Sequence, residues 1–263
     1  MSEPITRRVW ATDHETLVTQ AGEHGPAVVL LHALGLDRRM WEPVLGPLSA
    51  GRRVFAYDIR GHGHAAGAPT PFRLADTATD LVAVLDALEV EWAHLVGLSY
   101  GGGIAQTVAA HQPERLASLS LLATTDEAFG AFEDRARAAE TDGMAAQVPT
   151  SLARWFTPEG LADDGWGVRY ARDRVAHFRV ADWAATWRAF AGLDVRGKLA
   201  DLGVPVLVLA GERDVSTTPA AMTALAERIP GSTYRELPGI PHLMTLERPE
   251  VVTAALADFL PTA

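Results

Sequence analysis

The stretch HLVGLSYGGGIAQ, residues 94–106, places three consecutive glycines at the start of an expected helix, directly after a run typical of a buried strand. A glycine inside a helix costs about 1 kcal/mol relative to alanine. The stretch also fits the pattern G-x-S-x-G, with Gly97, Ser99 and Gly101 at the fixed positions. In this pattern strand and helix approach so closely that the flanking positions must lack a side chain. We therefore predict that Ser99 is a nucleophile on a strained turn.

The composition is that of a globular chain which can bury a large core. The chain has 263 residues, 48% of them hydrophobic, and a formal net charge of -10. This charge argues against binding to nucleic acid or to an anionic membrane surface. The absence of cysteine excludes disulfides, thiolate metal sites and a cysteine nucleophile. Because the beginning MSEPITRRVWATDHETL has no apolar signal segment, and no long apolar run follows, we expect a cytoplasmic protein.

Short apolar or β-branched runs alternate with helical patterns along most of the chain. One such helical pattern covers 74–90, and Pro249 marks the start of another. The alternation predicts an α/β fold with a mostly parallel eight-stranded sheet flanked by helices, in which the first two strands form an antiparallel hairpin. The predicted strands are 7–11, 16–20, 27–32, 53–58, 92–97, 116–124, 204–211 and 232–237.

Residues 126–192 interrupt this alternation. They contain four of the seven tryptophans and eight arginines, but no run typical of a strand. We therefore predict that residues 1–125 and 193–263 form the core domain, and that 126–192 form a helical cap inserted above the edge of the sheet.

A serine nucleophile needs a base that takes its proton and an acid that orients the base. His242, in LPGIPHLMTLERPE, is the best candidate base, since it lies in a loop between the last predicted strand and the last helix. Asp214, in VLVLAGERDVSTTP, follows the preceding strand and is the candidate acid. The order serine, acid, histidine is the one expected of this architecture. Asp126 and Glu212 remain alternatives for the acid.

Attack on a carbonyl also requires hydrogen-bond donors for the oxyanion that forms. The first expected donor is the backbone N–H of Tyr100, which follows the nucleophile at the start of a helix. The second is the N–H of Leu34, in the loop HALGLDRRMW, where Gly35 lets the chain turn. In the same loop His32 is expected to act as a structural residue that holds the loop by a hydrogen bond.

Over nearly its whole length the chain resembles the α/β-hydrolase superfamily. Four motifs carry the resemblance: HALGLDRRMW, YDIRGHGHA, GLSYGG, and GERD followed by PGIPH. Within the superfamily the chain is similar to 3-oxoadipate enol-lactonases. It departs from them at His32-Ala33, where an asparagine-containing loop is common, and at Ala65, where many relatives have serine.

The resemblance implies a serine hydrolase that cleaves a carboxylic ester or lactone through an acyl-enzyme, without a cofactor. The expected partner is a small-molecule ester or lactone, with neither nucleic acid nor membrane. The serine argues against relatives that use aspartate as nucleophile. A general carboxylesterase, a perhydrolase and a carbon–carbon bond hydrolase remain alternatives. A ligand-binding receptor on the same fold is the alternative that is not an enzyme.

Candidate substrate-binding residues are Trp155, Trp187 and Leu243. No metal site is expected, because His62 and His64 lack the further ligands that known sites have. An enol-lactonase must also bind a free carboxylate, and burying this charge without a cation would be prohibitive. The predicted cap supplies eight arginines that could provide the cation, namely Arg135, Arg137, Arg154, Arg169, Arg172, Arg174, Arg179 and Arg188.

Overall fold

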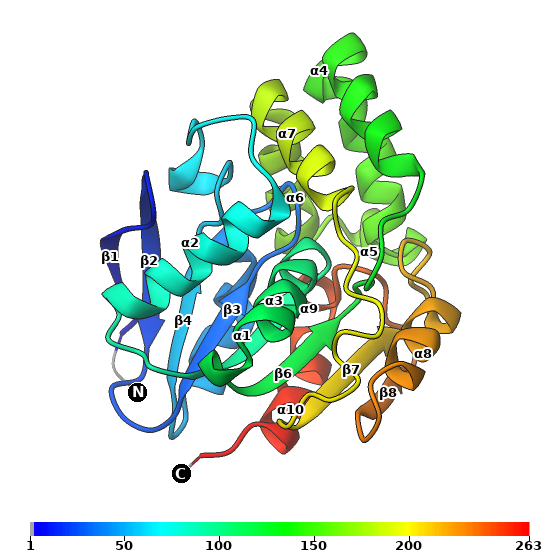
Figure 1. The fold of residues 1–263 in the computed structure, drawn as a ribbon. Coiled ribbons are helices and arrows are strands. Elements are labelled where there is room, and N and C mark those ends of the chain that lie inside the picture. Colours follow the sequence, from blue (N-terminus) through cyan, green and yellow to red (C-terminus); the bar gives the residue numbers. More distant parts are fainter. Residues whose placement is uncertain (1–2, 263) are drawn as a thin grey trace.

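The computed structural model describes residues 3–262, which contain one eight-stranded sheet (Figure 1). Neighbouring strands follow the order β1-β2-β4-β3-β5-β6-β7-β8. Strand β2 pairs antiparallel with β1 and β4, whereas all other neighbours are parallel. The strands are β1 (Ile5–Trp10), β2 (Glu15–Ala21), β3 (Ala27–Leu31), β4 (Arg53–Tyr57), β5 (Ala93–Leu98), β6 (Leu116–Leu122), β7 (Val206–Gly211) and β8 (Thr233–Leu237).

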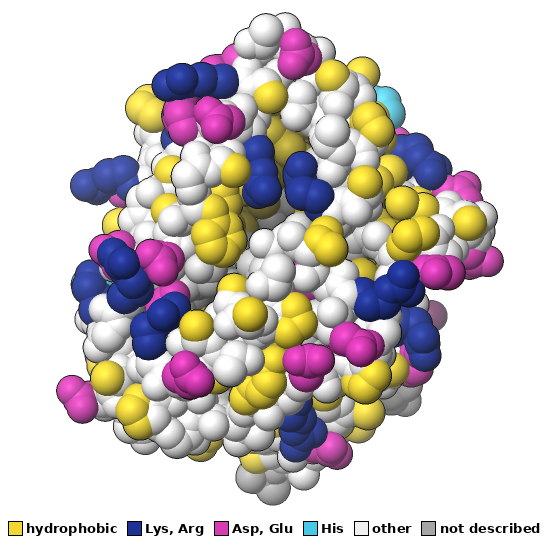
Figure 2. All heavy atoms as spheres, turned by 90° about the vertical axis from the view of Figure 1, so that its right-hand side faces the viewer, with side chains coloured by type: hydrophobic (Ala, Val, Ile, Leu, Met, Phe, Trp, Pro, Cys, Tyr) yellow, Lys and Arg dark blue, Asp and Glu magenta, His cyan; other side chains and the backbone are white. Residues whose placement is uncertain are grey.

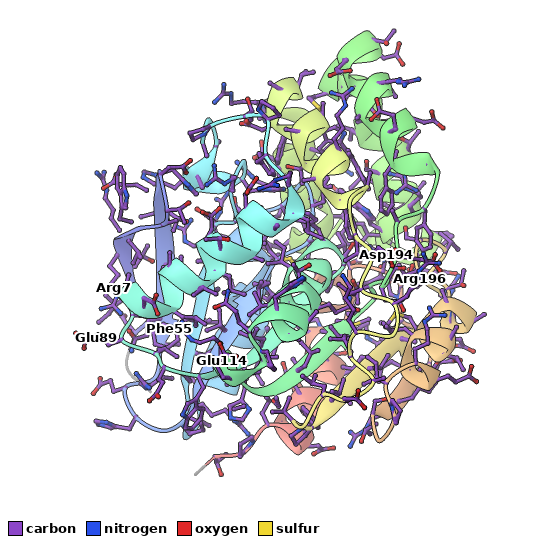
Figure 3. All side chains as sticks on the ribbon, in the orientation of Figure 1. Arg7, Phe55, Glu89, Glu114, Asp194 and Arg196 are labelled. Carbon is purple, nitrogen blue, oxygen red and sulfur yellow. The ribbon has the colours of Figure 1, made fainter. Side chains whose placement is uncertain are left out.

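The central strands are buried on both faces, as their apolar runs require. Every residue of β3, β5 and β7 is buried. Side chains of the outer strand β1 are mostly exposed, and Figure 3 contrasts Arg7 on this strand with the buried Phe55 of β4. This burial pattern is the one expected of a parallel sheet covered by helices, with a solvated antiparallel edge.

Helices α2 and α3 pack against each other in front of the sheet in Figure 1, and α1 packs against α10. Pro249 begins α10, as predicted from the sequence. The helices are α1 (Glu42–Leu48), α2 (Leu74–Ala87), α3 (Tyr100–His111), α4 (Ala131–Trp155), α5 (Pro158–Asp163), α6 (Trp166–Ala176), α7 (Val180–Phe190), α8 (Pro219–Glu227), α9 (Met244–Glu247) and α10 (Pro249–Phe259). Among the described residues, no helix combines the length and the apolar character needed to cross a bilayer.

Helices α4 to α7 form the predicted helical insertion between β6 and β7, and α4 and α7 lie at the top of Figure 1. Helix α4 is divided into two arms by Gly143, whose φ of 74° is not helical. Its neighbour α7 packs along α4. The prediction of an eight-stranded, mostly parallel sheet with a helical insertion is confirmed, whereas the exact division into core and cap domains stays a prediction.

The start of α3 approaches the end of β3 more closely than any side chain would allow. A Cβ atom built on Gly101 would overlap the backbone carbonyl of Leu31, and one built on Gly97 would overlap the backbone of Gly101. Backbone atoms cannot move aside as the end of a flexible side chain can. The glycines that looked costly in the sequence are therefore what allows α3 to begin directly after β5.

We expect Gly101→Ala to lower the free energy of unfolding by at least about 2 kcal/mol, because overpacking against a backbone forces helix and sheet apart. The matched control is Gly203→Ala, since a Cβ atom at the exposed Gly203 would meet no atom within 4 Å. This control should change stability by less than about 0.5 kcal/mol. Urea denaturation of both variants measures the difference, and equal stabilities would contradict the steric account.

Candidate active site

Ser99 occupies the turn between β5 and α3 with a strained backbone. Its φ of 54° and ψ of -115° lie outside the regions that a serine normally adopts. The turn is held because the Ser99 N–H donates to the Leu122 carbonyl at 2.9 Å and the Thr124 hydroxyl donates to the Ser99 carbonyl at 2.7 Å. Ser99 is also partly exposed between buried neighbours. The structure therefore presents the Ser99 side chain at the carboxyl end of the sheet.

His242 and Asp214 lie in direct contact, although they come from different loops. The Nδ1 atom of His242 is 2.8 Å from Oδ2 of Asp214, and both side chains are buried. Thr217 completes the group, since its hydroxyl donates to the same carboxylate oxygen at 2.7 Å. The N–H groups of Ser216 and Thr217 donate to the other oxygen, Oδ1, at 2.7 and 3.0 Å.

These contacts keep Asp214 ionised despite its burial. Burial alone raises the pKa of a carboxyl group, but the charge of His242 and the hydrogen bonds from His242 and Thr217 outweigh it, so that the pKa of Asp214 lies below its ordinary value. An ionised Asp214 can hold His242 in the tautomer that carries its proton on Nδ1. The other ring nitrogen, Nε2, is then available as a base.

The two alternative acids have other partners. The Asp126 carboxylate receives two hydrogen bonds from Arg228, at 2.6 and 2.7 Å. Glu212 accepts a hydrogen bond from the N–H of Gly239 at 2.6 Å. Of the three acids considered from the sequence, the structure brings Asp214 to His242.

The backbone N–H groups of the two expected oxyanion donors have no acceptor in the described structure. Leu34 lines the same cavity as Ser99, and no described residue accepts a hydrogen bond from its N–H. Tyr100 is the first residue of α3, so its N–H has no acceptor within the helix. His32 holds the loop as expected, because its Nε2 accepts a hydrogen bond from the N–H of Ile59 at 2.9 Å.

Helix α6 of the insertion binds the loop that carries Leu34 through Asp37. The Tyr170 hydroxyl contacts the Asp37 carboxylate at 2.9 Å and the Asp37 N–H at 3.1 Å. Arg174, also on α6, lies 3.1 Å from the same carboxylate. Burial raises the pKa of Asp37, but hydrogen bonds and charge from Arg39 and the charge of Arg174 lower it well below its ordinary value. The insertion therefore fixes this loop through an ionised, buried carboxylate.

The cavity beside Ser99 is enclosed mainly by aromatic side chains of the insertion. It contains Ser99, His242 and Leu34 together with Trp155 and Trp187. Leu243 is buried but does not line this cavity, and its N–H donates to the Trp155 carbonyl at 3.0 Å. The remaining lining residues are Ala33, Thr125, Phe129, Phe132, Arg135, Phe190, Ser216 and Thr217.

Arg135 is the permanently charged side chain among the described residues that line this cavity. Its guanidinium lies 4.8 Å from the ring centre of Trp187 and 5.7 Å from that of Phe132. Burial lowers the pKa of Arg135, but no acidic side chain contributes to the shift. The cavity thus combines apolar walls with one cation that has no acidic partner in the described structure.

Several residues of this site were missed from the sequence. Thr217 could have been found, because an acid followed at short range by serine and threonine is typical of an Asx turn. Phe129, just before α4, and Phe132, in its first turn, had no comparable signal, since aromatic residues usually serve packing alone. The contact between Tyr170 and Asp37 joins residues 133 positions apart, so only the tertiary structure reveals it.

The described structure gives His62 a role in packing. His62 is fully buried beside Phe178, with ring centres 5.0 Å apart, and burial and the neighbouring His32 lower its pKa to about 3. One other group, Asp13, His14 and Asp80, has its ligand atoms close enough together for a metal ion.

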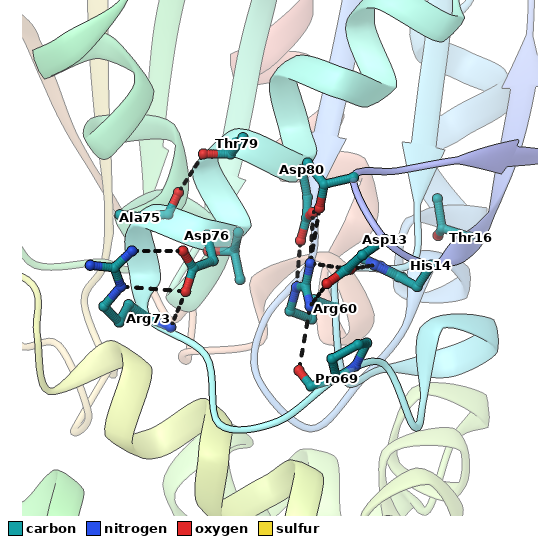
Figure 4. A network of polar contacts seen from close by, with 12 residues as sticks. Asp13, His14, Thr16, Arg60, Pro69, Arg73, Ala75, Asp76, Thr79 and Asp80 are labelled. Carbon is teal, nitrogen blue, oxygen red and sulfur yellow. Dashed lines mark hydrogen bonds and ion pairs between the residues drawn. The ribbon is translucent and has the colours of Figure 1, made fainter.

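An arginine already occupies the centre of that group. Figure 4 shows the guanidinium of Arg60 between Asp13 and Asp80, at 2.6 and 2.7 Å from their carboxylates. This cation satisfies both acids, so the cluster is an internal ion pair and we assign no metal to it.

Comparison with known proteins gives consistent results along the chain. Residues 26–249 match the family model described as alpha/beta hydrolase fold. The 3-oxoadipate enol-lactonase 2 of Acinetobacter baylyi is 32% identical over 234 residues, which cover 88% of this chain and 87% of that protein.

Solved structures also resemble the whole chain. The enol-lactonase from Burkholderia xenovorans LB400 superimposes with a TM-score of 0.92 at 31% identity, covering 96% of this chain and 99% of that one. A thermophilic esterase from Thermogutta terrifontis, solved with malate bound, gives a TM-score of 0.88 at 28% identity and covers 98% of both chains.

We expect Tyr170→Phe to lower kcat for every substrate by about three- to tenfold, the value of one hydrogen bond, because the loop that carries Leu34 loses its anchor. KM should change less than about twofold, since the aromatic ring and its packing are kept. Tyr234→Phe, the same change at the distant end of the sheet, is the matched control. A Tyr170→Phe enzyme that melts earlier but keeps its kcat would show that the contact serves stability alone.

Proposed function

This chain belongs to the α/β-hydrolase family, and we propose that it is a serine hydrolase that cleaves carboxylic esters or lactones through an acyl-enzyme. The observation that supports the proposal best is the shared cavity of Ser99, His242 and Leu34. It holds a candidate nucleophile, a candidate base and an oxyanion donor within one partly enclosed space. A receptor that only binds a ligand would not require this combination.

In the proposed reaction His242 Nε2 takes the proton of the Ser99 hydroxyl while the oxygen attacks the substrate carbonyl carbon. The resulting oxyanion accepts hydrogen bonds from the N–H groups of Leu34 and Tyr100. The carbon–oxygen bond to the leaving group then breaks, and His242 returns the proton to the departing oxygen. In a lactone this oxygen stays attached to the acyl chain, so the opened substrate remains bound to Ser99.

Water completes the turnover in the proposed scheme. His242 takes a proton from the water molecule as the water oxygen attacks the acyl-enzyme, and it then protonates Ser99 as the ester bond breaks. Asp214 stabilises the positively charged imidazole that forms in both halves of the reaction.

We further propose that the substrate is a small lactone bearing a carboxylate, as in a 3-oxoadipate enol-lactonase. The support is Arg135, a cation without an acidic partner that lines the same cavity as Ser99. The relatives named above agree with this choice, since two are enol-lactonases and the esterase binds malate, a dicarboxylate. The aromatic walls favour a second candidate, a carboxylesterase for neutral aryl or alkyl esters.

The experiment that tests the activity compares purified wild-type protein on a neutral aryl ester, a neutral lactone and a lactone carrying a carboxylate. The proposal expects the highest kcat/KM for the carboxylated lactone. A clear preference for the neutral ester would favour the carboxylesterase, and the absence of any turnover would favour a binding protein.

Ser99→Ala should lower kcat by about 10⁴- to 10⁶-fold, as the loss of a serine nucleophile does in other hydrolases. Circular dichroism and thermal melting should be nearly unchanged, because the side chain removed is small and partly exposed. A Ser99→Ala protein that keeps most of its activity would overturn the assignment of the nucleophile.

Asp214→Asn should lower kcat by about 10⁴-fold, because an amide favours the wrong histidine tautomer. Asp126→Asn is the matched control, since Asp126 is also a buried acid but pairs with Arg228. This control should lower stability more than kcat. If Asp126→Asn proves the more damaging to kcat, Asp214 is not the acid that serves His242.

A further inference from the structure

Two arginines of the insertion differ from the other six because the guanidinium of neither contacts a carboxylate or a backbone carbonyl in the described structure. Arg135 lies on the first arm of α4 and Arg154 on the second. Among the described residues, neither forms an ion pair with a carboxylate. Five of the others form ion pairs, namely Arg137–Glu133, Arg172–Asp164, Arg174–Asp37, Arg179–Asp182 and Arg188–Glu140. The sixth, Arg169, donates to the backbone carbonyl of Asp164.

Arg154 is only partly exposed, and its guanidinium makes few hydrogen bonds within the protein. Its Nε atom is buried without a hydrogen-bond partner in the described structure, and its one side-chain contact is a long bond of 3.5 Å to the Ser151 hydroxyl. Burial, together with the charge of the nearby Arg135, lowers the pKa of Arg154 to about 10. At neutral pH both side chains are therefore cations that repel each other.

Both arginines line a second groove, which adjoins the cavity beside Ser99 at Arg135. The groove lies between the two arms of α4 and is also lined by Trp183 and Gln147. Arg135 lines both the groove and the cavity, whereas Arg154 lines the groove. Figure 2 shows a hollow below the insertion with two basic side chains at its rim and no acidic side chain between them.

The acids that border the groove form no ion pair with its two arginines in the described structure. Asp134 and Asp142 belong to its lining, but both are exposed and neither pairs with Arg135 or Arg154 in the described structure. Holding two partly desolvated cations side by side is unfavourable unless an anion joins them. Three observations together therefore indicate a ligand: neither arginine has an ion-pair partner, the Nε atom of Arg154 is buried without a hydrogen bond, and a groove lies beside both side chains.

A small carboxylated lactone at Ser99 would satisfy Arg135 and leave Arg154 without an anion. We propose that Arg154 and the groove form a distal subsite, which binds a carboxylate at the far end of an acyl chain that extends past Arg135. This inference rests on the proposed function for the reaction at Ser99. It adds a substrate class, namely esters or lactones whose acyl chain is long and ends in a carboxylate.

The test uses para-nitrophenyl monoesters of glutaric, suberic and dodecanedioic acid. Each is compared with the para-nitrophenyl ester of a fatty acid of similar length. The enzymes are the wild type, Arg135→Met and Arg154→Met, with Arg137→Met as the control for an arginine that is already paired. Methionine keeps the apolar stem of the side chain, so packing is largely preserved.

Arg135→Met should lower kcat/KM for the glutarate ester by about tenfold or more, the value of a charge-assisted hydrogen bond. Arg154→Met should change kcat/KM for the glutarate ester by less than about twofold. It should lower kcat/KM for the suberate or dodecanedioate ester by about tenfold. Each effect is read as the ratio of kcat/KM for the carboxylated ester to kcat/KM for the neutral ester of similar length, so that a change in cavity packing common to both esters cancels. If Arg154→Met leaves the ratio of carboxylated to neutral substrate unchanged at every length, the distal subsite does not exist.

Binding to Ser99→Ala protein gives a readout that does not need turnover. Trp183 lines the groove, so its fluorescence can follow a titration with suberate. Adding Arg154→Met should raise the Kd about tenfold, while adding Arg137→Met should leave it unchanged. If suberate binds equally well with and without Arg154→Met, the distal subsite does not exist, even if the wild-type protein hydrolyses esters. If Arg154→Met weakens suberate binding but the wild-type protein hydrolyses none of the esters, the proposed function is wrong and the subsite stands.

Discussion

The contact between the start of α3 and the end of β3 is the constraint on which the site depends. The Cα of Gly101 lies where any side chain would overlap the carbonyl of Leu31. This close approach forces Ser99 into its positive φ and lifts the side chain out of the buried strand. It also places the first N–H of α3 beside the loop of Leu34. A looser junction would lose the exposed serine and the position of the neighbouring N–H groups together.

Much of the core could be predicted because its signals are local. Apolar runs give the eight strands, and loops at the carboxyl ends of parallel strands meet at one edge, which brings Asp214 to His242. The insertion could be recognised as helical, but its contacts could not be predicted. All eight arginines look alike in the sequence, and only tertiary packing gives Arg188 two acids while Arg154 has none. The bend of α4 depends likewise on the conformation of Gly143, not on a periodic pattern.

The insertion contributes to the site in three physical ways. Its aromatic residues give the cavity apolar walls, and a less polar surrounding strengthens the electrostatic interactions there. Tyr170 anchors the loop of Leu34 through Asp37, so the position of the Leu34 N–H, which we propose as an oxyanion donor, depends on the insertion. Arg135 and Arg154 supply positive charge to a protein whose net charge is -10. An acidic protein that places cations at one cavity and at the groove beside it can attract anionic substrates that the rest of its surface repels.

An acyl group trapped on Ser99 is the direct signature of the proposed nucleophile. Wild-type protein is mixed with para-nitrophenyl butyrate, quenched in acid during turnover, and analysed by mass spectrometry before and after proteolysis. If Ser99 is the nucleophile, the protein gains one butyryl group per chain, on the peptide that contains Ser99. A butyryl group on another residue, or hydrolysis without any covalent adduct under conditions where deacylation is slow, would contradict it.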